Sequence, residues 1–117
     1  MCSSNFFFVR EGRRFIKIEI ASILYIESQK NYSRIFLSAR SFMISVPLKE
    51  METLLAGADF CRIHRSYIVN LAYLSSFDNS KATLAGKTLS IGESYRKSLA
   101  AKVTIVGAPK KAALNVC

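Results

Sequence analysis

A chain of 117 residues is long enough for one domain with a modest core and too short for two full-sized domains. Half of its residues are hydrophobic, but no apolar run reaches the roughly 18 to 20 residues that cross a bilayer, so the sequence predicts a soluble protein. The net charge is +9, and residues 61–117 carry 9 Lys or Arg against 2 Asp or Glu. This excess favours a polyanionic partner, with an anionic membrane and a merely solubilising surface as the alternatives.

The cysteine and histidine content excludes several classes of site. Cys2, Cys61 and Cys117 are an odd number without close spacing, so neither a disulfide framework nor a zinc site is indicated. With a single His and scattered carboxylates, we expect no metal and no cofactor. Residues 1–9 lack the basic start and long apolar core of a signal peptide. The cysteine usage is typical of a reducing cytoplasm.

The first half of the chain predicts mainly strands. Residues 6–9 and 14–18 are rich in β-formers and should form a hairpin, in which Gly12 supplies a positive φ. Residues 23–27 are almost continuously apolar, which predicts a central strand buried on both faces. The polar residues 28–31 predict a loop into the strand 32–37. A solvated turn is the alternative to a binding role for that loop.

The second half predicts two helices and a meander. Pro47 fits a helix start, Leu48, Met51, Leu54 and Leu55 form one apolar stripe, and Gly57 can end this short lid helix. After Asn70, which can cap a helical turn, three short strands are predicted between residues 74 and 91. A last helix opens at residues 92–95, carries apolar side chains every fourth residue, and ends at Gly107 and Pro109.

Residues 60–70 are the stretch around which the chain is organised. Apolar side chains alternate there with Arg62, His64 and Ser66, the pattern of a half-buried strand that presents cationic and hydrogen-bonding groups along one edge. His64 beside Ser66 superficially resembles a base and its nucleophile. However, no carboxylate stands nearby to orient the ring, and no glycine-rich oxyanion turn follows. The stretch therefore predicts binding and not an enzyme.

Three segments resemble the LytTR DNA-binding domain of bacterial response regulators in their order and spacing. They are ILYIES at 23–28, RIHRSYIVN at 62–70 (preceded by LKEME at 48–52) and IGESYRK at 91–97. The resemblance covers about residues 8–103. Together with at least seven strand signals, it predicts a mainly β fold: an elongated domain of several small antiparallel sheets with a short lid helix and a C-terminal helix. Residues 1–107 would form this domain, and 108–117 a basic, disordered tail.

The resemblance implies sequence-specific binding of double-stranded DNA by loops and strand edges, as the output domain of a two-component transcriptional response regulator. In that family direct repeats are usually bound by two copies, and a receiver domain is expected in the full-length protein. Whether the chain is an excised C-terminal domain or a stand-alone protein stays open.

By resemblance, three places contact DNA: the loop after the central strand, the His-Arg-Ser segment and the entry to the final helix. The expected contact residues are Lys30, Asn31, Ser33, Arg34, His64, Arg65, Ser66, Glu93, Arg96 and Lys97. Glu93 departs from the family, which often has a basic residue at this position. Its carboxylate would repel phosphate, although it can accept a hydrogen bond from cytosine N4. Arg96 and Lys97 are therefore the better candidates for phosphate contact.

Two other functions fit parts of the sequence. One is a small β domain for protein interaction or ligand sensing, in which the positive charge is incidental. The other is single-stranded nucleic acid binding, with Tyr32, Tyr67 and Tyr73 stacking on bases. Against the latter, Tyr25, Tyr67 and Tyr95 fall in apolar patterns that indicate core positions.

Overall fold

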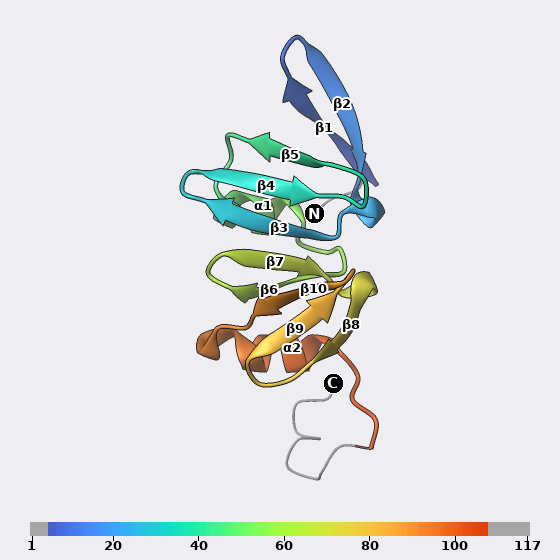
Figure 1. The fold of residues 1–117 in the computed structure, drawn as a ribbon, viewed down its shortest axis with the longest axis vertical. Coiled ribbons are helices and arrows are strands. Elements are labelled where there is room, and N and C mark those ends of the chain that lie inside the picture. The colour runs from blue at the N-terminus through green and yellow to red at the C-terminus, as the bar shows by residue number, and fades with distance from the viewer. Residues whose placement is uncertain (1–4, 108–117) are drawn as a thin grey trace.

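The computed structural model describes residues 5–107, so the predicted tail 108–117 lies outside the described residues. The domain is elongated, with principal extents of 54 × 27 × 24 Å, and its strands form three separate antiparallel sheets (Figure 1). The strands are β1 (Phe6–Glu11), β2 (Arg14–Glu19), β3 (Tyr25–Gln29), β4 (Tyr32–Phe36), β5 (Ser41–Ile44), β6 (Phe60–His64), β7 (Tyr67–Asn70), β8 (Leu74–Phe77), β9 (Lys81–Leu84) and β10 (Lys87–Ser90). The helices are α1 (Leu48–Leu54) and α2 (Arg96–Lys102). The predicted fold class is confirmed.

The first sheet is the predicted β1–β2 hairpin, which projects from one end of the domain (Figure 1). Gly12 has a φ of +64° in the turn, a conformation that is open to glycine because it has no Cβ. The two strands pair in register from Phe6 opposite Glu19 to Glu11 opposite Arg14. Val9 and Ile18 are buried against the rest of the protein, which anchors the hairpin by one face.

The central sheet has the strand order β5-β4-β3-β7-β6, so β3 is central as predicted. One face carries Ile26 on β3, Ile35 on β4 and Ile68 on β7, and α1 covers these side chains with Leu48 and Met51. This is the predicted lid. Leu54 was expected in the same apolar stripe, but its side chain is 44% exposed because it turns toward solvent at the last helical position. Gly57 follows the helix with a φ of +92°, as expected.

The second core lies on the other face of the central sheet, near its β6–β7 edge. Cys61, Ile63 and Val69 pack there against the β10-β9-β8 meander and against Leu99 of α2. Asn70 is buried; its side chain donates to the Ile23 carbonyl at 2.8 Å and accepts from the Ala72 N–H at 3.0 Å, so the predicted cap of a helical turn is confirmed.

The final helix is shorter than predicted. A single 3₁₀ turn, η3 (Glu93–Tyr95), precedes α2, and α2 ends at Lys102, not near Gly107. Val103 already has extended backbone angles of φ −122° and ψ 155°, so the four-residue apolar repeat continues past the last helical turn. Lys102 donates from Nζ to the Phe60 carbonyl at 3.1 Å and ties this end of the helix to β6.

Candidate nucleic-acid interface

The three segments singled out in the sequence lie along one edge of the domain: the β3–β4 turn, the β6–β7 turn and the start of the final helix (the left side of Figure 1). Two backbone hydrogen bonds connect them. The Ser28 N–H donates to the Ser66 carbonyl at 2.8 Å, and the Gly92 N–H donates to the Ile63 carbonyl at 2.8 Å. Segments that are more than 25 residues apart in the chain therefore form one continuous surface.

The β3–β4 connection is a tighter turn than the predicted loop. Ser28 and Gln29 belong to β3, and Gln29 pairs with Tyr32, so only Lys30 and Asn31 form the turn. Lys30 has a φ of +60°, and both turn side chains are exposed. The turn thus presents one cation and one amide away from the sheet.

Ser33 does not reach outward, and this expectation was wrong. Its side chain is fully buried and donates from Oγ to the Val46 carbonyl at 2.6 Å. The reason is strand alternation, because Ser33 shares its face of β4 with the buried Ile35. Arg34 points to the opposite face, where it is half-buried opposite Glu27 and donates to the Ser41 hydroxyl at 3.1 Å. It lies on the sheet and not in the turn.

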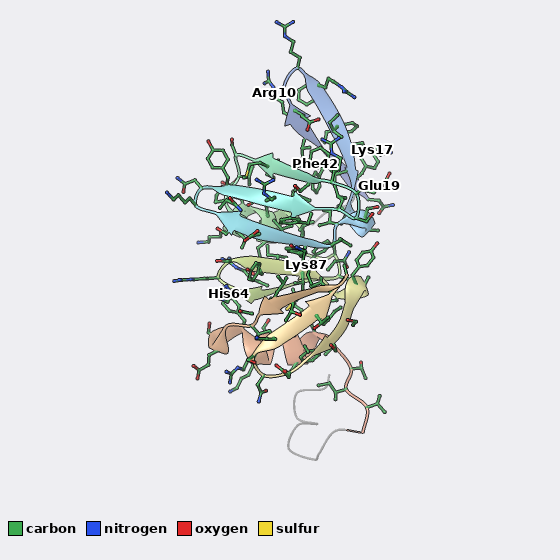
Figure 2. All side chains as sticks on the ribbon, viewed as in Figure 1. Arg10, Lys17, Glu19, Phe42, His64 and Lys87 are labelled. Carbon is green, nitrogen blue, oxygen red and sulfur yellow. The ribbon has the colours of Figure 1, made fainter. Side chains whose placement is uncertain are left out.

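The β6–β7 turn fixes the orientation of His64. Its Nδ1 accepts a hydrogen bond from the Ser66 backbone N–H at 3.0 Å, and its ring lies 5.3 Å from that of Tyr67. Because Nδ1 is an acceptor, neutral His64 carries its proton on Nε2, which remains a donor for another molecule. Figure 2 shows His64 at the same edge as the turn. The ring contacts the Ser66 backbone and not its hydroxyl, so this geometry does not activate a nucleophile.

Arg62 holds this turn from beneath, a role that the sequence did not reveal. Its guanidinium donates from Nε to the His64 carbonyl at 3.2 Å and from Nη2 to the Arg65 carbonyl at 2.6 Å. Nη1 forms an ion pair with Glu52 of α1 at 3.1 Å. The Arg62 side chain is only 17% exposed. It was expected to share one face with His64, but the register shifts between the two residues: Arg62 lies opposite Ile68, on the face that α1 covers, whereas His64 lies opposite Tyr67.

Gly92 allows the third segment to approach the His64 strand. A Cβ at this position would lie 3.7 Å from the His64 Cα and 3.1 Å from the Tyr95 ring. Beyond Gly92, the side chains of Glu93, Arg96 and Lys97 are all exposed. The segment therefore adds two cations and one carboxylate to the edge.

The electrostatic character of this edge follows from its unpaired cations. Within residues 5–107 the ion pairs are formed by Lys17, Arg40 and Arg62. Lys30, Arg65, Arg96 and Lys97 have no such pairs in the described part of the chain, so their charges remain available to an anion. No group of three metal-ligating side chains occurs in that part either. None of its helices is long and apolar enough to span a membrane.

A β-rich domain that presents basic turns and a helix start along one edge carries the electrostatic footprint that is typical of nucleic-acid-binding modules. The chain is a member of the LytTr DNA-binding domain family, whose model matches residues 13–104. It is accordingly a DNA-binding domain of transcription regulation, and the resemblance found in the sequence is confirmed.

Curated relatives include the CO-responsive transcriptional regulator RcoM of Rhodospirillum rubrum, 35% identical over 60 residues, which are 51% of this chain and 25% of that protein. The sensory transduction protein LytT of Bacillus subtilis is 26% identical over 94 residues, 75% of this chain and 39% of that protein. The chain thus spans less than half the length of either relative.

A solved structure shares the fold. It is the LytTr DNA-binding domain of a putative methyl-accepting/DNA response regulator from Bacillus cereus, with a TM-score of 0.74 and 18% identity. The match covers 86% of this chain and 97% of that domain.

Proposed function

We propose that this domain binds double-stranded DNA sequence-specifically through the edge formed by the β3–β4 turn, the β6–β7 turn and the start of the final helix. The observation that carries the proposal is that these three segments come together and present cations without intramolecular ion pairs. Unpaired Lys and Arg side chains along one edge can neutralise successive phosphates, while turns of this size can enter a groove.

Each exposed side chain at the edge has a distinct proposed contact. Arg65 sits at the tip of the β6–β7 turn and suits bidentate contact with guanine or a phosphate. His64 offers its Nε2–H as a donor, since Nδ1 is already occupied. In the neighbouring turn, Lys30 contacts phosphate and the Asn31 amide reads a base edge.

The remaining contacts come from the other candidate residues. Arg96 and Lys97 contact phosphate, and Glu93 accepts from cytosine N4. Ser66 contributes its hydroxyl beside Arg65, whereas Arg34 contributes only charge from the sheet face. Ser33 is excluded because it is buried.

The wider biological role is proposed from the relatives. RcoM and LytT are a transcriptional regulator and a sensory transduction protein by name, so we place this domain as the output part of a regulator in the cytoplasm. A receiver domain on the full-length protein, and two copies bound to direct repeats, complete the proposal. Selection of preferred duplexes from a random pool would identify the DNA target.

The proposal is tested by fluorescence anisotropy with labelled duplexes at several salt concentrations. Arg65→Ala should weaken binding and reduce the slope of log affinity against log salt by about one, because one phosphate contact is lost. Arg13→Ala is the matched control, since it removes the same charge from the exposed turn of the β1–β2 hairpin. Glu93→Arg should strengthen non-specific binding; unchanged or weaker affinity would count against placing Glu93 at the DNA.

Three results would contradict duplex recognition. Equal losses for Arg65→Ala and Arg13→Ala would mean that only net charge matters and that no site exists at this edge. Strong preference for single strands in competition would favour base stacking, for which Tyr32 and Tyr73 are 47% and 40% exposed but Tyr25 is buried against Phe36. Absence of any duplex binding at low salt would favour the protein-interaction alternative.

A further inference from the structure

Exposed apolar side chains gather, among charged ones, at the end of the domain that carries the β1–β2 hairpin. Of the large hydrophobic side chains exposed within residues 5–107, five gather on the hairpin, β5 and the end of α1: Phe6 at 39%, Phe8 at 55%, Phe15 at 66%, Met43 at 39% and Leu54 at 44%. Phe8, Met43 and Leu54 also line a groove of about 950 Å³ between β1 and β5. Contiguous exposed apolar surface of this kind marks an interaction site on a soluble domain.

The groove is bordered by two strand edges that have no neighbour. β1 pairs only with β2, and β5 pairs only with β4. In an antiparallel strand every second residue points its N–H and C=O away from the paired neighbour. Among residues 5–107, nothing bonds to the free edge of β1 between Phe6 and Arg10. This edge is therefore a template for another strand.

The two edges of the hairpin differ in their protection. β2 carries Arg14, Lys17 and Glu19 among its six residues, and such charges discourage pairing with another strand. β1 begins with four uncharged residues, three of them Phe, and β5 contains no charge at all. The unprotected edge thus faces the apolar groove, and the charged edge faces away from it.

We infer that the β1 edge pairs with the β1 edge of a second copy of this chain, antiparallel and centred on Phe8. In that register, the two Phe8 side chains meet and each Phe7 lies opposite Val9. Each Phe6 lies opposite Arg10 of the second copy, so this cation faces an uncharged residue. No like charges oppose one another, so the strand is complementary to itself, as a two-fold contact requires.

The contact lies away from the start of the final helix. The hairpin projects from one end of the elongated domain, and the segment from Gly92 to Arg96 lies at the opposite end (Figure 1). A two-fold axis inverts one copy relative to the other, whereas copies on direct repeats share one orientation. The hairpin contact is therefore a different arrangement from that of two copies on direct repeats, and it does not rest on the proposed function.

The test is sedimentation of the full chain without DNA, from about 1 to about 100 μM, the range in which micromolar dimers form. The wild type should shift from monomer to dimer with rising concentration. Phe8→Glu should abolish the shift by placing two carboxylates face to face, and its exposed position keeps the fold intact, as circular dichroism can check. Phe15→Glu, on the protected strand, is the matched control and should dimerise like the wild type.

Cross-linking tests the register independently. In a background with Cys2→Ser and Cys117→Ser, Phe8→Cys should give a disulfide-linked dimer under mild oxidation, because opposed residues of antiparallel strands lie within disulfide reach. Phe15→Cys should not. A wild type that stays monomeric across the range, equal loss of dimer in both Glu variants, or equal cross-linking at both positions would each overturn the inference.

Discussion

The replacement Arg62→Lys tests whether the guanidinium fork positions the β6–β7 turn. Lysine keeps the charge but replaces the planar fork by one compact ammonium, so it cannot reproduce the arrangement in which Nε and Nη2 of Arg62 donate to the His64 and Arg65 carbonyls at 3.2 and 2.6 Å. A hydrogen bond to a charged group contributes about 1.5 to 3 kcal/mol, and we take the lower end because the turn is partly exposed. The ion pair with Glu52, a half-exposed carboxylate, contributes under about 0.5 kcal/mol.

The free energy of unfolding should therefore fall by about 1.5 to 2 kcal/mol, equivalent to a Tm lower by about 6 to 8 °C for a domain of this size. Urea denaturation followed by circular dichroism measures the first quantity, and a thermal scan the second. DNA affinity should also fall, because the turn that presents Arg65 loses its support, while the salt slope stays near that of the wild type because the charge is kept.

Two control variants separate the possible causes. Glu52→Gln removes only the ion pair and should cost under about 0.5 kcal/mol. Arg40→Lys makes the same substitution at an exposed arginine that pairs with Glu11 far from the turn, and its loss of unfolding free energy should be similarly small. An Arg62→Lys variant as stable as these two would refute the argument that the turn is held by the fork.

Two further predictions concern buried groups. Ser33→Ala should lower the free energy of unfolding by about 1 to 2 kcal/mol, because the Val46 carbonyl loses its buried donor. The DNA affinity of the folded domain should stay unchanged. An anisotropy titration that shows weaker binding would place Ser33 at the DNA after all. Burial raises the pKa of the Cys61 thiol above its ordinary value of 9.0, so its contribution to stability is complete below that pH and is lost as the pH rises through the raised pKa. Urea denaturation should thus show that the free energy of unfolding falls less between pH 8 and pH 10 for Cys61→Ala than for the wild type. Equal falls in the two proteins would exclude the thiol as the cause.

Local patterns in the sequence were sufficient for the framework. The apolar run of β3 predicted its central place, Gly12 predicted the hairpin turn, and Pro47 with Gly57 bracketed the lid helix. These features depend on neighbouring residues only, through side-chain alternation and the φ that each residue can adopt. The same alternation could have placed Ser33 inside, since it lies two residues before Ile35 on one strand.

The composition of the proposed DNA-binding edge, by contrast, is a tertiary property. Which side chains of the three segments are exposed depends on the bonds from Ser28 to Ser66 and from Gly92 to Ile63, which join distant parts of the chain. The role of Arg62 in the turn could not be read from the sequence because its partners there are backbone carbonyls, which every residue possesses. Residue types thus determined the strands and turns. Only packing decided which polar groups are hydrogen-bonded within the protein and which remain exposed to a partner.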